Sequence, residues 1–552
     1  MTQKMEDEEA SMEDIIDKRE ELMVSPGGSS PTRRIAYFIK PCASSIHGCD
    51  LLPPFTSNHA NVAQEVRYHG WRMPHKKWKT WVQNMQLRYG HIWIKAGIHH
   101  AIKASTYEIN RNDELILALA QRWCSKTNTF IFPWGEATLT LEDMKACWGY
   151  SVMGGSVSSP LETTEEKEIE AKLIALRSMF IKSRAKKATQ TQWMKHFMDN
   201  ESQLEHEGFL SMWLSRFVFP AISEDTILKS VFSIAVHLAR GTRIALAPAV
   251  LASIYRDLSL LSKSVRSAAT MKLRVTLWAP FQLVQVWALE RFPALQPNPC
   301  PVRQGQPIMA KWDRVKMLKK NNLNLILDDA GSRNGFLWRP YQNSPPLYLY
   351  NEKDMWMCDN PCFDDELQAF SRCLRVSELV GMGCIENYRP NRVAMQFGMD
   401  QDIPGVVDPS NKDPWMSYSQ PIMDINLCPA LCSSQPKVTS RYYNWWKQLN
   451  SGKEGDTMKG HDHCLISKNS SQHLSPALTR EVKCDLSFGP LPDFTCKFGT
   501  CQVGNSGDNS EDIVADMQGE IVSVVPFNLE NRILKLETVI AKHKEAKFGS
   551  KG

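Results

Sequence analysis

The sequence predicts a mainly α-helical fold: a multi-helix domain with a small β-hairpin, flanked by flexible arms. Hydrophobic residues make up 43% of the 552 residues and charged residues 23%, a composition typical of a chain with a folded core. Many of the 17 tryptophans fall at helical spacings, so we interpret them as core side chains with one polar nitrogen to satisfy. Apolar residues also recur at helical spacing over 207–261.

The composition changes along the chain and suggests its organisation. Residues 1–66 begin with acidic residues and are then interrupted by Pro, Gly and Ser, which predicts a flexible N-terminal arm. The helical domain is predicted over 67–450, with a candidate internal linker near 158–190. Residues 451–517 are polar and rich in Ser, Asn and Gly, which predicts a disordered linker, and 518–552 are predicted to form a C-terminal helix.

The small hairpin is predicted around the turn Pro133-Trp134-Gly135. Short runs typical of strands lie on either side of it, at 129–132 and 137–139. Thr140 then stands where it can cap a helix, and Asp143 would lie near the positive end of that helix.

Two further stretches are predicted from charge and hydropathy. The charge-dense residues 161–187 are typical of a solvated helix or linker, although the basic cluster at 182–187 would also suit a nuclear import signal. The nearly apolar stretch from Val275 to Leu289 contains Thr276, Gln282 and Gln285 and is shorter than the ~20 residues that span a bilayer. We therefore interpret it as a buried helix and expect no membrane association.

An apolar stripe marks the C-terminal helix. Its members lie at heptad-like spacing: Leu529, Ile533, Leu536 and Ile540. Two heptads alone are marginal in water. The stripe is therefore expected either to pack on the body of the protein or to pair with a partner helix.

Signatures of catalysis and metal binding are weak in this sequence. It has no Walker-type loop and no His-Glu-x-x-His, and Ser158 stands where a nucleophile elbow requires Gly. Several groups of Cys and His lack the paired short spacings of a zinc site: Cys358 with Cys362, Cys428 with Cys432, Cys496 with Cys501, and His461 with His463 and Cys464. We predict no cofactor, no metal, and free thiols in a reducing compartment.

The charge balance gives little sign of nucleic-acid binding. The formal net charge is +5, from 65 basic and 60 acidic residues that are scattered along the chain. One stretch combines basic and aromatic residues as a binding surface for nucleic acid would: Lys76, Lys77 and Lys79 with Trp78 and Trp81. The same residues suit a helix with one apolar and one basic face, so both interpretations stay open.

Several ordered segments resemble the plant mobile domain family, in particular its longer members labelled aminotransferase-like. They include Gly-Trp-Arg-Met-Pro at 70–74, Phe-Pro-Trp-Gly-Glu-Ala-Thr at 132–138, His-Leu-Ala-Arg-Gly-Thr-Arg at 237–243, and Tyr-Asn-Trp-Trp at 443–446. The most recognisable segment is Asn-Tyr-Arg-Pro-Asn-Arg-Val-Ala-Met-Gln-Phe-Gly-Met-Asp-Gln-Asp at 387–402, called the signature segment below. Together such segments span about residues 20 to 450.

The resemblance implies a nuclear, non-catalytic binding or scaffolding protein tied to transposon and gene silencing and to meristem organisation. It also implies a nuclear protein partner, such as a phosphatase-like protein. A direct nucleic-acid-binding protein of mobile-element origin is the first alternative. A cryptic aminotransferase-like enzyme is the second, but the sequence has neither alternating strand and helix units nor a Gly-rich phosphate loop to support a pyridoxal phosphate site.

Within the resemblance, two places concentrate candidate contacts for a partner or an anion. The signature segment carries Arg389, Arg392, Asp400 and Asp402, whose guanidinium groups suit planar anions. The alternative is a buried Arg/Asp network that fixes helix packing, since unpaired buried charge is costly. Trp134 and Glu136 form the second place, although a turn whose indole covers the core is the simpler interpretation.

Overall fold

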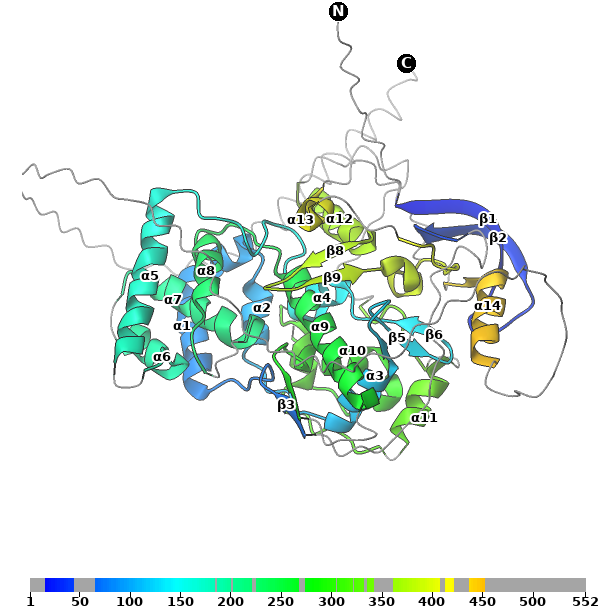
Figure 1. Cartoon of the computed structure of the whole chain (residues 1–552), viewed down its shortest axis with the longest axis horizontal. Coiled ribbons are helices and arrows are strands. Elements are labelled where there is room, and N and C mark those ends of the chain that lie inside the picture. The colour runs from blue at the N-terminus through cyan, green and yellow to red at the C-terminus, as the bar shows by residue number, and fades with distance from the viewer. Residues whose placement is uncertain are drawn as a thin grey trace, which may run out of the picture. The chain divides into compact units, whose positions relative to one another are not determined.

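The computed structural model describes residues 15–43, 65–183, 186–199, 202–220, 225–267, 274–303, 305–320, 322–331, 335–341, 361–407, 413–420 and 436–451. Over these residues the fold is mainly α-helical with small sheets, as predicted (Figure 1). The helices are α1 (Lys76–Lys95), α2 (His99–Ala104), α3 (Asp113–Arg122), α4 (Leu141–Trp148), α5 (Thr164–Lys182), α6 (Gln190–Asp199), α7 (Glu205–Trp213), α8 (Phe232–Ala239), α9 (Leu246–Ser267), α10 (Gln282–Arg291), α11 (Leu323–Asp328), α12 (Pro361–Leu374), α13 (Pro414–Ser419) and α14 (Ser440–Ser451).

The strands form small separate sheets. They are β1 (Ile16–Val24), β2 (Thr32–Ile39), β3 (Glu65–Tyr68), β4 (Trp123–Cys124), β5 (Thr129–Phe132), β6 (Gly135–Ala137), β7 (Arg274–Leu277), β8 (Ser377–Val380), β9 (Ile385–Tyr388) and β10 (Val438–Thr439). The sheets have the orders β10-β1-β2, β4-β5-β6 and β8-β9, all antiparallel, and β3-β7, which is parallel.

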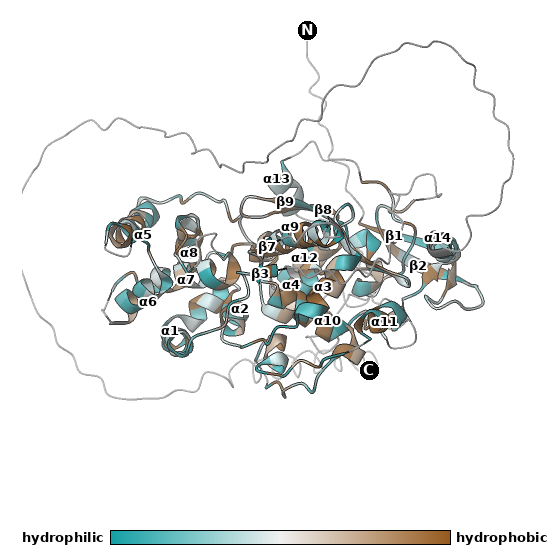
Figure 2. Cartoon of the chain, turned by 60° about the horizontal axis from the view of Figure 1, so that its bottom comes forward, coloured by the Kyte–Doolittle hydropathy of each residue, from teal (hydrophilic) through white to brown (hydrophobic). Residues whose placement is uncertain are grey.

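Helix α9 lies at the centre of the larger core. It contacts α3, α4, β7 and β8, and α10 packs in turn on α3 and α4. Figure 2 shows α9 as largely hydrophobic ribbon, and the side chains from Val250 to Leu258 that face inward are almost wholly buried. Such burial against several elements at once stabilises the fold mainly by removing apolar surface from water.

The predicted use of tryptophan as a core side chain is confirmed. Trp78 on α1 stacks on Phe209 of α7 with ring centroids 4.9 Å apart, and its indole nitrogen donates to Ser105 Oγ over 3.1 Å. Trp81 donates in the same way to Glu205 Oε1 over 2.9 Å. Nine of the largest fully buried side chains in the described residues are tryptophans.

Local signals for the hairpin and its following helix are confirmed. Strands β5 and β6 pair antiparallel around the predicted turn, with Phe132 opposite Gly135. Thr140 caps α4, and a reciprocal capping box joins its side chain and that of Asp143 to backbone N–H groups.

The prediction that Val275 to Leu289 form one buried helix is wrong. Residues up to Leu277 form β7, which pairs with β3, and α10 begins only at Gln282. Pro280 separates the two, because a residue before proline is disfavoured in helical conformation. Among the helices of the described ranges, none is both long and apolar enough to cross a membrane.

The N-terminal part also differs from the flexible arm predicted over 1–66. Residues 16–39 form the β1-β2 hairpin, whose first strand also pairs with β10, near α14 (Figure 1). The Pro, Gly and Ser residues that suggested a break form the turn of this hairpin, where Gly28 has φ +85° and its N–H donates to Ser25 O over 2.9 Å. Within the candidate linker near 158–190, α5 begins with its own capping box at Thr163.

A buried histidine joins α7 to α1. His206 Nε2 accepts a hydrogen bond from Trp93 Nε1 over 3.0 Å, and the ring of Tyr89 stacks on the imidazole with centroids 4.0 Å apart. Because Nε2 is an acceptor here, the ring is neutral and carries its proton on Nδ1. Burial, followed by the positive charges of Arg88 and Arg240, lowers the pKa of His206 to about 3.

This histidine should make stability depend on pH. An unfolded histidine has a pKa of about 6.5, so between that value and the folded pKa the unfolded state binds the extra proton, and the free energy of unfolding falls as pH falls. From pH 7 to about pH 5 we expect His206 to account for a loss of about 2 kcal/mol. Urea unfolding of His206→Gln, whose amide oxygen can still accept from Trp93, should show a flatter pH dependence than the wild type.

The exposed residue His91 on α1 provides the control. His91 is the last and smallest of the charges that lower the pKa of His206, so His91→Gln should keep most of the pH dependence of the wild type. If the free energy of unfolding changes equally with pH in all three proteins, His206 is not the source of the pH dependence.

Candidate functional site

The signature segment is joined to the predicted hairpin by a buried ion pair. Arg392, at the end of the 3₁₀ helix η8 (Pro390–Arg392), donates from Nε and Nη2 to the two carboxylate oxygens of Glu136, each over 2.8 Å. Both side chains are almost fully buried. Thr129 Oγ1 also donates to Glu136 Oε2 over 2.6 Å. The carboxylate is thus well satisfied, and β5 and β6 are fixed to η8.

The two aspartates of the signature segment bind the N-terminal hairpin and the chain around β10. Asp402, whose side chain is fully buried, pairs with Arg19 of β1 and Arg441 of α14 and accepts from Thr439 Oγ1 over 2.8 Å. Asp400 pairs with Arg34 of β2 over 2.5 Å. These contacts join three stretches that are far apart in sequence.

Arg389 is half-buried immediately before η8. Arg392, Asp400 and Asp402 therefore face partners inside the fold, in two groups of ion pairs. This geometry supports the interpretation of the cluster as an internal network. Its use as an anion or partner site remains a sequence-based prediction.

Two glutamines of the signature segment, which were not among the predicted site residues, hydrogen-bond backbone N–H and C=O groups through their side-chain amides. The side-chain amide of Gln396 accepts from Thr138 N and donates to Thr138 O, each over 2.8 Å. Gln401 accepts from Ala394 N and donates to Asn391 O over the same distance. Gln396 has a signal in the sequence, because it is an amide within the otherwise apolar run 393–399 and must find a partner once buried. Gln401 is flanked by Asp400 and Asp402 and has no such signal.

A second buried ion pair joins α4 to α10. Asp143 of α4 accepts from Arg291 of α10 and from the Tyr341 hydroxyl, each over 2.7 Å, and both ion-pair side chains are fully buried. The local sequence around Asp143 indicates only a residue at a helix start. Its partners come from more than a hundred residues away, so no local pattern marks them.

Trp134 supports a short helix rather than pointing into solvent. Its ring stacks on Phe132 with centroids 4.6 Å apart, and its Nε1 donates to the carbonyl oxygen of Leu327 on α11 over 2.9 Å. Gly331, just after α11, packs so closely on Trp134 that an added Cβ would lie 2.2 Å from the Trp134 Cβ. The turn therefore positions α11 and the residues that follow.

On α11 lies an open groove, which we call the α11 groove. It has a volume of about 490 Å³, within the range of ligand pockets. Its described lining residues are Ala294, Lys319, Lys320, Asn322, Leu325, Ile326, Asp329, Ala330 and Gly335. Most of its surface is aliphatic, with two lysines at one side.

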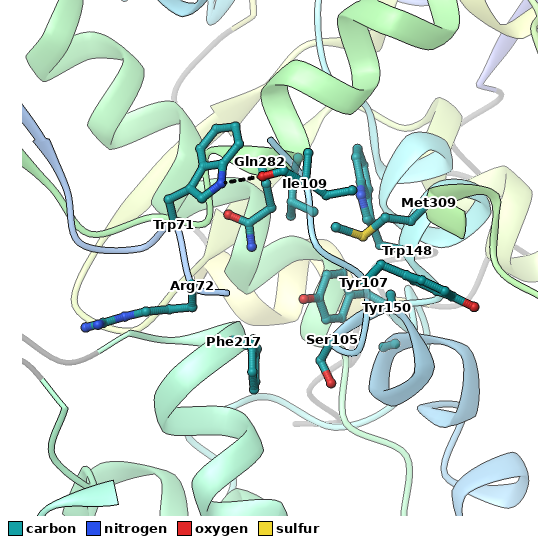
Figure 3. Close-up of a pocket in the computed structure, with 13 residues that line it drawn as sticks. Trp71, Arg72, Ser105, Tyr107, Ile109, Trp148, Tyr150, Phe217, Gln282 and Met309 are labelled. Atoms are coloured by element: carbon teal, nitrogen blue, oxygen red, sulfur yellow. Dashed lines mark hydrogen bonds between the residues drawn. The ribbon is translucent and has the colours of Figure 1, made fainter. Parts of the chain in front are cut away.

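A second hollow is small and enclosed by aromatic side chains (Figure 3). Trp71, Tyr107, Trp148 and Phe217 line it, and its volume of about 20 Å³ holds about one water molecule. Trp71 Nε1 donates to the carbonyl oxygen of Ile109 over 3.0 Å, the dashed line of Figure 3. This hollow is too small for a cofactor or substrate.

The residues proposed for nucleic-acid stacking have other roles. Trp78 and Trp81 are buried in the core described above, so neither presents a free ring face. Lys79 pairs with Glu108 over 2.8 Å, whereas Lys76 and Lys77 are exposed at the start of α1. The helix with one apolar and one basic face is the interpretation that this geometry favours.

Two sets of predicted residues lie outside the described ranges: the helix-pairing stripe (Leu529, Ile533, Leu536 and Ile540), and the Cys and His groups considered for zinc, of which only the backbone of Cys362 is described. Within the described part, no group of three or more His, Cys, Asp or Glu side chains is arranged to hold a metal ion.

The fold and these contacts define a class: a mainly helical domain whose motif residues bind its own distant segments together. Residues 97–447 match the family model of the plant mobile domain, and the chain belongs to this family. The match covers the signature segment, Glu136 and the whole of α11.

Relatives from Arabidopsis thaliana share this region. Protein MAINTENANCE OF MERISTEMS is 25% identical over 320 residues, which are 55% of this chain and 61% of that protein. The serine/threonine-protein phosphatase 7 long form homolog is 24% identical over 57% of this chain and 23% of its own length, and Protein MAIN-LIKE 2 is 24% identical over 54% and 44%. The chain thus spans less than two thirds of each relative. No solved structure matches it.

Removing one partner of the Glu136–Arg392 pair should destabilise the fold strongly. Arg392→Met leaves a buried carboxylate without its counter-charge, and we expect the free energy of unfolding to fall by about 3–5 kcal/mol. Glu136→Gln/Arg392→Met removes both charges, keeps an acceptor for Thr129, and should recover at least half of the loss. Urea unfolding followed by tryptophan fluorescence measures all three proteins.

The exposed pair of Arg67 with Glu65 is the matched control. Arg67→Met should change the free energy of unfolding by no more than about 1 kcal/mol. A loss of that small size for Arg392→Met would contradict a role of the buried pair in holding the fold.

Proposed function

We propose that this chain is a nuclear, non-catalytic protein that binds a protein partner and acts in gene and transposon silencing and in meristem maintenance. Family membership supports the general class, and the name of one relative refers to the maintenance of meristems. We propose a phosphatase-like protein as the kind of partner; another relative is named as a phosphatase homolog.

The observation that carries the proposal is a difference between buried and surface residues: the charged motif residues bind other parts of the chain, and the α11 groove lies open at the surface. Arg392, Asp400 and Asp402 are engaged with Glu136 and with distant segments of the chain, which is a structural use of charge. On the surface, the α11 groove combines an aliphatic lining with lysines. Apolar surface rimmed by polar groups is typical of protein interaction sites.

Co-purification tests the proposal. The tagged full-length chain is recovered from plant nuclei at moderate salt, with and without nuclease, and the retained proteins are identified by mass spectrometry. We expect chromatin or phosphatase-like proteins that remain bound after nuclease treatment, and a fluorescent fusion that accumulates in the nucleus.

A shortened chain that ends at Asp516 tests whether the partner contacts the C-terminal apolar stripe or the helical domain with the α11 groove. If the same partner is lost from it, the contact requires the stripe of Leu529, Ile533, Leu536 and Ile540. If the full chain retains only nuclease-sensitive nucleoprotein, the proposal is wrong and direct nucleic-acid binding replaces it.

A further inference from the structure

The floor of the α11 groove leaves large apolar side chains in contact with water. Leu325 is 56% exposed although it lies on a helix, and Ile326 beside it also lines the groove. Leu318, just before the lysines, is 43% exposed. Single exposed leucines are ordinary. Here Leu325 and Ile326 both line one hollow, so a partner that fills it would remove the two side chains from water together.

The charges around this floor are unbalanced. Lys319 and Lys320 line the groove, and neither makes an ion pair in the part of the chain that the structure describes. The carboxylate of Asp328 is already engaged by Arg122 over 2.7 Å, which leaves Asp329 as the acidic residue of the described lining. The lining of the groove is therefore apolar with a net positive charge. A complementary ligand is apolar and carries negative charge.

We propose that the α11 groove binds an acidic, amphipathic segment of the partner protein. Leucine, isoleucine or phenylalanine side chains of that segment lie on Leu325 and Ile326, and its aspartates or glutamates meet Lys319 and Lys320. This inference rests on the proposed function, because it names the chemistry of the partner and the surface that it contacts.

The aliphatic side chains of the lining favour a peptide over a nucleic acid as the ligand. Bases of single strands bind on aromatic side chains, whereas the apolar lining here is aliphatic: Ala294, Leu325, Ile326 and Ala330. The groove is also held in place from below, because Trp134 binds the backbone of α11 at Leu327. A preformed groove lowers the ordering cost of binding a flexible segment.

Selection from a library tests the chemistry without assuming a partner. Random peptides of about 12 residues, displayed on phage, are selected on the immobilised full-length chain, and the enriched peptides are measured by fluorescence anisotropy. We expect enriched peptides in which Asp or Glu stands next to Leu, Ile or Phe. Lys319→Glu/Lys320→Glu and, separately, Leu325→Asp should weaken their binding by about tenfold or more, a difference of about 1.4 kcal/mol.

The exposed pair Lys76 and Lys77 on α1 supplies the matched control. Lys76→Glu/Lys77→Glu changes the net charge by the same amount, and it should leave peptide binding unchanged within about twofold. Peptides whose acidic residues are replaced by lysine should bind Lys319→Glu/Lys320→Glu better than they bind the wild type. Urea unfolding of each variant verifies that these surface changes leave the fold intact.

Several outcomes would overturn the inference. One is a peptide consensus without acidic residues, and another is binding that ignores all the groove variants. A third is displacement of the peptide by a single-stranded oligonucleotide that itself depends on Lys319 and Lys320, which would make nucleic acid the occupant.

The two proposals fail in different ways. If a nuclear partner co-purifies equally with the wild type and with Lys319→Glu/Lys320→Glu, the groove inference is wrong and the proposed function stands. If acidic peptides bind the groove but nuclei yield only nuclease-sensitive nucleoprotein, the groove inference stands and the proposed function is wrong.

Discussion

The fold depends on the buried pair of Glu136 and Arg392. Moving a carboxylate and a guanidinium out of water costs several kcal/mol for each ion, and only close pairing with further hydrogen bonds offsets this cost. The two charges therefore require β5 and β6 to meet η8. Once they meet, Gln396 completes the backbone hydrogen bonds of Thr138, and Asp400 and Asp402 stand where Arg34 and Arg19 reach them.

Local features of this fold were predictable from the sequence. The capping box of Thr140 and Asp143 and the β5-β6 turn each depend on residues that are neighbours in the chain. Helical apolar spacing likewise marked the core tryptophans. These signals act over a few residues, which is the range at which caps, turns and helix faces are determined.

What could not be predicted involves partners that are far apart. Glu136 and Arg392 are separated by 256 positions, and no spacing rule connects them. The β1-β2 hairpin was missed because its turn has the same composition as a flexible arm, and its partner strand β10 lies near the other end of the domain. The α11 groove was missed for a similar reason, since a six-residue helix gives little periodic signal and its support, Trp134, comes from a distant turn.

The pairing of β1 with β10 has a consequence for how the chain is made. Met23 lies opposite Thr439, and Arg19 pairs with Asp402 across 383 positions. At a synthesis rate of about 5–20 residues per second, the hairpin waits on the order of 20–80 s for β10 to be made. During this time the buried face with Met23, Ala36 and Phe38 lacks its native cover. The first strands of this domain can therefore be completed only after β10 has been made, and a nascent chain presents them to chaperones before it presents them to its own signature segment.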